Sequence, residues 1–244
     1  MKIIPNFHNF IDALPEDIRN EIGSMTISRK IAIDEPVYRQ GDRSNELYQL
    51  LEGAVRVCNY TADGKEVVTG HFRPGDCFGE MGLIDDLPRM NHAIANEPSR
   101  VRVLGKQHFK QLYEKHPEIS HELNVMFCHR IRLLYALSED ANTLSLIQRL
   151  ARLLHRMVYS HGVTEADGSL YVGSSHEELG RMLGASRQSV SKELKVLETE
   201  GSVKNCYGKI YVCSIESLRM KYENLLGQEQ LTPWYSGTPV DKIS

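Results

Sequence analysis

The sequence contains few aromatic residues and few cysteines for its length. Phe, Trp and Tyr make up 7% of the 244 residues, which argues against the aromatic-rich surfaces that stack sugars or single-stranded nucleic acid. The five cysteines are scattered, and no two have the Cys-x-x-Cys spacing of a zinc ribbon. We therefore expect reduced thiols in a cytoplasmic protein, with no disulfide framework and no metal site.

Long apolar runs and a targeting segment are also missing. No run approaches the ~18–20 apolar residues that a membrane span needs, and the first residues do not resemble a signal peptide, so we expect no membrane partner. The net charge is −3, yet residues 174–221 carry eight Lys and Arg against six Asp and Glu. This one net-positive segment favours a nucleic acid partner.

Short strand-like runs separated by turn signals fill residues 29–104. The turn signals include Glu52-Gly53 and Asp63-Gly64. Strands this short and this closely spaced indicate a sandwich or barrel. The predicted strands are Leu47–Leu51, Ala54–Tyr60, Val67–Phe72 and Val101–Leu104, and a short helix over Leu14–Met25 precedes them.

Residues 107–159 change character, because they contain no glycine and only one proline, Pro117. We predict a short helix over Gln107–Lys115, a long helix from about Pro117, and a further amphipathic helix over Thr143–Tyr159. Apolar residues on the long helix alternate at spacings of 3 and 4, the pattern of a coiled-coil seam. A long helix packed on its own domain would show a similar pattern, but we favour a dimer interface formed by Phe127, Arg130, Leu134, Leu137, Ala141 and Leu144.

Residues 175–200 predict two helices joined by a tight turn. Ser175 and Glu178 form a capping box, and Gly184 stands where the first helix must end. In the second helix the apolar residues share one face, while Arg, Gln, Ser and Lys share the other, which suits a DNA major groove. An ordinary solvated helical hairpin is the alternative. A candidate hairpin around Gly208 follows as a wing. The predicted DNA contacts are Ser175, Ser186, Arg187, Gln188, Ser191, Lys192, Lys204 and Lys209.

A second group of residues, Phe78-Gly79-Glu80-Met81-Gly82-Leu83 followed by Pro88-Arg89, lies within the strand-rich region. The glycines let backbone amides approach a ligand closely, and Arg89 offers a forked, charge-assisted contact to a phosphate. Glu80 is a natural acceptor for a ribose hydroxyl. An exposed turn with an ordinary Glu–Arg ion pair is the alternative.

Over about residues 15–226 the chain resembles the Crp–Fnr family of bacterial transcription regulators. FGEMGL followed by PR resembles the phosphate-binding cassette of cyclic-nucleotide-binding domains, and SRQSVSKELKVLE resembles the recognition helix of the family. The resemblance implies that Gly79 and Glu80 meet the ribose and the cassette backbone, that Met81 and Gly82 belong to the same cassette, and that Arg89 holds the cyclic phosphate. It also implies that Arg187, Gln188 and Lys192 read bases.

The sequence departs from the family at the base end of the site. Met90 stands where a small or hydroxylated residue is usual, and Leu134 and Tyr135 stand where cyclic AMP sensors of the family carry hydroxyl groups that contact the base. The phosphate end therefore matches the family better than the base end does. The expected effector is a cyclic nucleotide, with cyclic AMP and cyclic GMP both open.

Together these observations predict an α+β protein that is a transcription regulator and not an enzyme. We expect an N-terminal antiparallel β-barrel of the jelly-roll, cyclic-nucleotide-binding type (residues 1–116), a dimerisation helix (117–142), a winged helix-turn-helix (143–227) and a C-terminal tail (228–244). The expected partners are double-stranded DNA with a two-fold symmetric operator, a second copy of the chain, and RNA polymerase. The alternatives are a cyclic-nucleotide-binding signalling module that acts through protein contacts, and a redox or haem sensor of the same fold.

Overall fold

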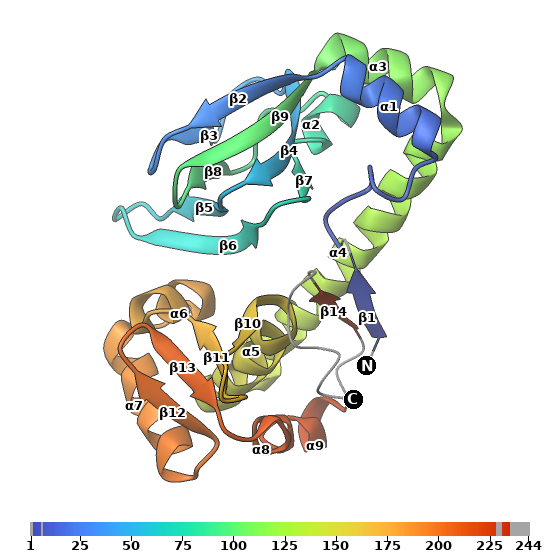
Figure 1. Cartoon of the computed structure of the whole chain (residues 1–244). Helices are drawn as coiled ribbons and strands as arrows, with labels where there is room; N and C mark the ends of the chain where they lie inside the picture. Colours follow the sequence, from blue (N-terminus) through green and yellow to red (C-terminus); the bar gives the residue numbers. More distant parts are fainter. Residues whose placement is uncertain (1, 6, 228–230, 235–244) are drawn as a thin grey trace. The chain divides into compact units, whose positions relative to one another are not determined.

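The computed structural model describes residues 2–5, 7–227 and 231–234 (Figure 1). They form two compact units, which we describe separately. The barrel unit contains residues 7–130. The C-terminal unit contains residues 131–227 and 231–234 together with Lys2–Pro5, so the first strand belongs with the last part of the chain rather than with the barrel. The long helix α4 (Pro117–Thr143) contributes residues to both units.

The barrel unit is built from two four-stranded antiparallel sheets, as the sequence predicts. The sheet orders are β2-β9-β4-β7 and β3-β8-β5-β6. The predicted strands correspond to β4, β5, β6 and β9. The prediction missed β3, β7 and β8, which are two to four residues long, and β2, whose residues do not alternate between exposed and buried. The strands are β2 (Ile27–Ile31), β3 (Pro36–Tyr38), β4 (Glu46–Glu52), β5 (Val55–Tyr60), β6 (Glu66–Phe72), β7 (Cys77–Phe78), β8 (His92–Ala95) and β9 (Ser99–Gly105).

Two apolar cores hold the barrel unit together. The first lies between the sheets and includes Leu50, Val55 and Val101, none of which has any exposed surface. The second core joins α1 (Glu16–Ser24), α3 (Lys106–Lys115) and the first half of α4. Pro15 precedes the first residue of α1, where its missing N–H costs nothing.

The C-terminal unit contains a helical core covered by a four-stranded sheet of order β10-β11-β13-β12. Leu150, Leu154, Leu179 and Leu194 are fully buried at its centre. The remaining elements are α5 (Leu146–His161), β10 (Gly162–Thr164), β11 (Leu170–Gly173), α6 (His176–Leu183), α7 (Arg187–Thr199), β12 (Val203–Cys206), β13 (Lys209–Val212), α8 (Ile215–Met220) and α9 (Glu223–Leu226).

Part of the predicted C-terminal tail is ordered as a strand. β14 (Leu231–Trp234) pairs in parallel with β1 (Lys2–Pro5), and Thr232 is fully buried. Residues 228–230 and 235–244 of the predicted tail lie outside the described residues. A four-residue strand with a partner some 230 positions away leaves no local signal, because only the long-range pairing defines it. Within the described part of the chain, none of the helices combines the length and apolar character that crossing a bilayer demands.

Candidate ligand pocket and DNA-binding surface

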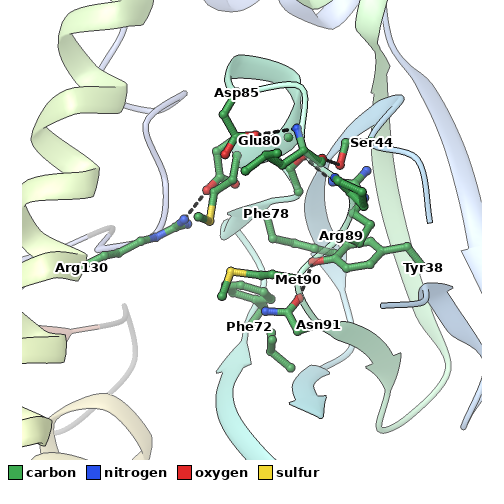
Figure 2. Close-up of a pocket in the computed structure, with 16 residues that line it drawn as sticks. Tyr38, Ser44, Phe72, Phe78, Glu80, Asp85, Arg89, Met90, Asn91 and Arg130 are labelled. Atoms are coloured by element: carbon green, nitrogen blue, oxygen red, sulfur yellow. Dashed lines mark hydrogen bonds and ion pairs between the residues drawn. The ribbon is translucent and has the colours of Figure 1, made fainter. Parts of the chain in front are cut away.

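A cavity of about 350 Å³ lies inside the barrel unit, beside the predicted cassette. Figure 2 shows a polar end, with Glu80, Arg89 and Arg130, and an aromatic end, where Phe72 lies beside Met90 and Asn91. The rings of Phe72 and Phe78 stack with their centroids 4.7 Å apart. A pocket with charged groups at one end and apolar rings at the other suits a ligand that carries both an anion and a flat ring system.

Two positions of the cassette have room only for glycine, because other parts of the chain pass close to their backbone. Gly79 has φ = +84°, and a Cβ there would lie 2.7 Å from Arg89 Nη1. Gly82 lies in the single helical turn α2 (Met81–Ile84), and a Cβ on it would lie 2.1 Å from Ser44 Oγ and 2.4 Å from the Leu87 carbonyl oxygen. Side chains at these two positions would therefore displace the residues that shape the polar end.

The Arg89 guanidinium is buried and aligned with the cassette. It is 6% exposed and donates to the carbonyl oxygens of Gly79 and Glu46, both at 2.5 Å. Its central carbon lies 4.4 Å from the centroid of the Tyr38 ring, a cation–π contact. Its Nε has no hydrogen-bond partner among the residues that the structure describes. A buried guanidinium that contacts only neutral acceptors has a strong electrostatic preference for an added anion.

Glu80 is the most buried charged residue of the cavity lining, at 1% exposure. One carboxylate oxygen pairs with Arg130 Nη1, while Oε2 is buried and has no hydrogen-bond partner in the described part of the chain. Such an oxygen is an unused acceptor for a ligand hydroxyl.

Arg130 is a correction to the sequence prediction, which placed it in the dimer seam. Besides Glu80, it donates to the Cys77 carbonyl oxygen at 2.9 Å and to His8 Nδ1 at 3.0 Å. Burial, and secondarily the Arg130 charge, holds the pKa of His8 well below its ordinary value. The charged side chain within an apolar pattern was the signal that could have found it, because a guanidinium is costly in a seam unless it is paired.

The two-helix motif of the C-terminal unit has the predicted local geometry. Ser175 Oγ accepts from the Glu178 amide at 3.1 Å, and Ser186 Oγ accepts from the Ser189 amide at 3.0 Å, so both hydroxyls cap helices. Gly184 takes the left-handed conformation between α6 and α7. Val190, Leu194 and Leu197 are fully buried. The exposed face of α7 carries Arg187, Gln188, Ser191 and Lys192.

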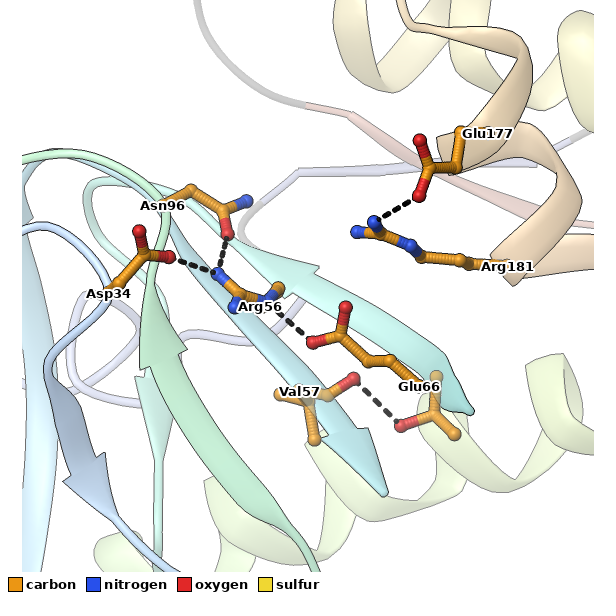
Figure 3. Close-up of polar contacts among 8 residues, drawn as sticks. Asp34, Arg56, Val57, Glu66, Asn96, Glu177 and Arg181 are labelled. Carbon is orange, nitrogen blue, oxygen red and sulfur yellow. Dashed lines mark hydrogen bonds and ion pairs between the residues drawn. The ribbon is translucent and has the colours of Figure 1, made fainter. Parts of the chain in front are cut away.

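Ion pairs within the unit reduce the basic charge available near α7. Arg181 pairs with Glu177 on α6 at 2.7 Å (Figure 3). On the hairpin β12–β13, which we call the wing, Lys209 lies 2.6 Å from Glu165, and its charge is therefore partly offset. Lys204 is exposed. Asn205 connects the wing to the helices. Its side-chain Oδ1 lies 3.1 Å from His176 Nε2, and its backbone N–H donates to the Glu198 carboxylate.

Comparison with known proteins matches both units to one family. The cyclic nucleotide-binding domain matches residues 28–116, and the Crp-like helix-turn-helix domain matches residues 148–220. This chain belongs to the Crp–Fnr family of transcription regulators. It is therefore a regulator with a cyclic-nucleotide-binding domain and a DNA-binding helix-turn-helix domain, and not an enzyme.

The relatives of this Crp–Fnr regulator are similar over most of their length. The cAMP-activated global transcriptional regulator CRP of Pasteurella multocida is 29% identical over 174 residues, covering 70% of this chain and 82% of that protein. The cyclic AMP receptor protein of Thermus thermophilus is 27% identical, covering 87% and 94%. The crystal structure of a CRP-family transcriptional regulator, also from Thermus thermophilus, has a TM-score of 0.67 at 28% identity, covering 79% and 95%.

The predicted seam of the Crp–Fnr regulator is only partly exposed. Leu134, Tyr135 and Leu137 are 63%, 75% and 40% exposed, and Ala141 is exposed as well. Leu144, however, is only 6% exposed, and Phe127 is half-buried against the second core of the barrel unit. Phe127 and Leu144 therefore have less surface free for a partner than Leu134 and Leu137, and the seam as a whole stays a prediction.

Several cavity residues were missed by sequence reasoning. Tyr38 lies on a strand far from the cassette in sequence, whereas Phe72 ends the strand just before it. The pairing of β3 with β8 and of β6 with β5 brings both rings to the cavity. Asn91 follows the cassette by two positions, but nothing in its type marked it as a lining residue. Cys77 is buried, and burial raises the pKa of its thiol, as for a small structural core residue.

Proposed function

We propose that this Crp–Fnr regulator is a homodimer that binds two-fold symmetric DNA when a cyclic nucleotide occupies the barrel cavity, and that it acts on transcription by RNA polymerase. The single observation that carries the proposal is the pair of unused buried groups at one end of the cavity. Among the described residues, Glu80 Oε2 has no donor, and Arg89 donates only to neutral carbonyl oxygens.

A cyclic nucleotide complements both groups. A ribose hydroxyl can donate to Glu80 Oε2, and the singly charged cyclic phosphate can accept from Arg89. Both groups belong to one such ligand, and both side chains line the polar end of one cavity. The curated relatives are named for activation by cyclic AMP, which supports the same ligand class.

DNA recognition is assigned to α7 and the wing. Arg187 can donate two hydrogen bonds to guanine O6 and N7, Gln188 can pair with adenine N6 and N7, and Lys192 reaches a base or a phosphate one turn further on. We expect the exposed Lys204 to meet backbone phosphates, which position the protein without specifying sequence. Two copies of α7 related by a two-fold axis would read half-sites one DNA turn apart.

Isothermal titration of the protein with cyclic AMP and cyclic GMP tests the effector site. Loss of the charge-assisted contact in Arg89→Ala removes about 1.5–3 kcal/mol, so we expect affinity to fall by about one to two decades. Arg100→Ala is the matched control, because Arg100 lies on β9 and pairs with Glu52 outside the cavity. Equal affinity of Arg89→Ala and the unmodified protein would exclude this role of the cassette.

A further inference from the structure

The aromatic end of the cavity holds a polar side chain that the proposed function does not use. Asn91 lines the cavity and is half-buried, and Figure 2 places it beside Phe72 and Met90. Rings of this kind accept a flat base, but they do not distinguish one purine from another, because stacking tolerates any base. Discrimination between purines needs a hydrogen-bonding group at the base edge, and the side-chain amide of Asn91 is such a group.

The Asn91 amide is oriented by Tyr38. The Tyr38 hydroxyl donates to Asn91 Oδ1 at 3.4 Å. Burial raises the pKa of Tyr38 well above its ordinary value, so the phenol keeps its proton. Figure 2 shows the amide oxygen directed to Tyr38 and the amide nitrogen on the other side, next to Phe72. Within the described part of the chain, Asn91 Nδ2 makes no hydrogen bond, and it is therefore the free end of the amide.

We propose that Asn91, positioned by Tyr38, reads the base of the bound cyclic nucleotide and selects guanine over adenine. This inference rests on the proposed function. The major-groove (Hoogsteen) edge of guanine presents two acceptors, O6 and N7, whereas the same edge of adenine presents the N7 acceptor and an amino donor. An amide that offers its NH₂ group satisfies the guanine edge. The adenine amino group needs an acceptor, whereas the amide oxygen of Asn91 is turned toward the Tyr38 hydroxyl.

Tyr38 also connects the two ends of the site. Its ring lies 4.4 Å from the Arg89 guanidinium, while its hydroxyl reaches Asn91. Tyr38→Phe keeps the ring beneath Arg89 and removes only the hydroxyl that restrains the amide. The Tyr38→Phe variant therefore tests base selection without disturbing phosphate binding. Asn91→Ala tests the same point by removing the amide itself.

Isothermal titration with cyclic GMP, cyclic IMP and cyclic AMP tests the assignment, because hypoxanthine shares O6 and N7 with guanine and lacks the 2-amino group. We expect the unmodified protein to bind cyclic GMP and cyclic IMP about tenfold more tightly than cyclic AMP, the discrimination expected of an edge contact. Asn91→Ala should bring all three affinities together, and Tyr38→Phe should raise the affinity for cyclic AMP, because the amide is then free to turn. Tyr60→Phe, at a residue that does not line the cavity, should leave the ratios unchanged.

Three results would overturn the assignment. They are a preference for cyclic AMP in the unmodified protein, ratios unchanged in both variants, and cyclic IMP binding as weakly as cyclic AMP, which would place recognition at the 2-amino group. The proposed function fails separately, if none of the three nucleotides binds or if Arg89→Ala leaves binding intact. Circular dichroism and thermal unfolding of each variant verify that it is folded.

Discussion

At the scale of single residues, buried polar side chains decide what the barrel cavity can hold. Arg130 contacts Glu80, Cys77 and His8 at once, so one guanidinium connects the polar end of the cavity to the N-terminal segment. His8 in turn lies with its ring 4.9 Å from Phe7 and 5.5 Å from Phe72. Such a network is stable only while each member keeps its charge state, which makes it sensitive to protonation.

His8 predicts a pH dependence of folding stability. Its pKa in the folded protein lies well below 6.5, because burial and Arg130 oppose protonation, whereas the unfolded chain takes up the proton near 6.5. The contribution of His8 to the free energy of unfolding is therefore complete above pH 6.5 and declines as the pH falls below it, by about 1.4 kcal/mol per pH unit, until the folded pKa is reached.

Chemical denaturation of His8→Gln between pH 5 and 8 measures this effect. In His8→Gln the free energy of unfolding should fall less steeply below pH 6.5 than in the unmodified protein. His121→Gln, at a side chain that is 74% exposed, should keep the full pH dependence. A slope in His8→Gln identical to that of the unmodified protein would show that His8 does not contribute.

Gly82 predicts a second effect at residue scale. Gly82→Ala places a methyl group against Ser44 Oγ and the Leu87 carbonyl, and the backbone contact at 2.4 Å leaves no rotamer to relieve it. We expect the affinity for a cyclic nucleotide to fall at least tenfold, because the cassette backbone must move away from Ser44 and Leu87 to make room for the methyl group. Gly23→Ala is the control: no atom lies within 4 Å of the added Cβ in helix α1, and thermal unfolding should show a gain of up to about 1 kcal/mol. Full affinity in Gly82→Ala would show that the turn is not rigid.

At the scale of elements, caps and ion pairs determine how the DNA-binding helices present their side chains. Ser175 and Ser186 satisfy helix N-termini, so their main role in this structure is to begin α6 and α7. Salt bridges to Glu177 and Glu165 occupy Arg181 and Lys209. The cations left facing outward on α7 and the wing are therefore Arg187, Lys192, Lys195 and Lys204.

This distribution predicts different effects for two basic residues. Arg187→Ala should cost ~1–3 kcal/mol and relax the preference at one base pair of each half-site. Lys204→Ala should weaken binding to all sequences about equally and flatten the dependence of log K on log salt by about 0.9 for each phosphate that is no longer neutralised. Binding-site selection and fluorescence anisotropy at several salt concentrations measure the two effects. An unchanged preferred sequence at full affinity in Arg187→Ala would show that α7 does not read bases.

At the scale of the whole molecule, the exposed part of α4 is the surface that a second copy would cover. Ile131, Leu134 and Leu137 are 50%, 63% and 40% exposed, and large apolar residues gathered on one helix favour burial against a partner. Leu137→Glu would place two carboxylates opposite each other in an apolar seam, which is unfavourable through both desolvation and charge repulsion.

Analytical ultracentrifugation of Leu137→Glu should therefore show a monomer, whereas we expect the unmodified protein to sediment as a dimer. Arg132→Glu is a matched control, because it adds the same side chain on the opposite face of α4 and should leave the dimer intact. A monomeric unmodified protein would contradict the proposed seam.

Local sequence determined the elements whose signals lie within a few residues of each other. The capping box at Ser175, the left-handed Gly184 and the inward spacing of Val190, Leu194 and Leu197 specify the helix-turn-helix without reference to the rest of the chain. The same holds for the cassette, because its glycines and Arg89 lie within eleven residues and act on one another. Strands with clear turns on both sides were likewise predictable.

Tertiary structure alone decided which residues meet around the cavity and which apolar residues stay exposed. Tyr38 and Asn91 are 53 positions apart and come into hydrogen-bonding distance only because β3 pairs with β8. Arg130 and Leu144 fit the spacing of a seam, yet one pairs with Glu80 and the other is buried in the C-terminal unit. Heptad spacing places a residue on a helix face, but the neighbours that pack on that face, and hence the burial and charge partners of each side chain, come from distant segments of the chain.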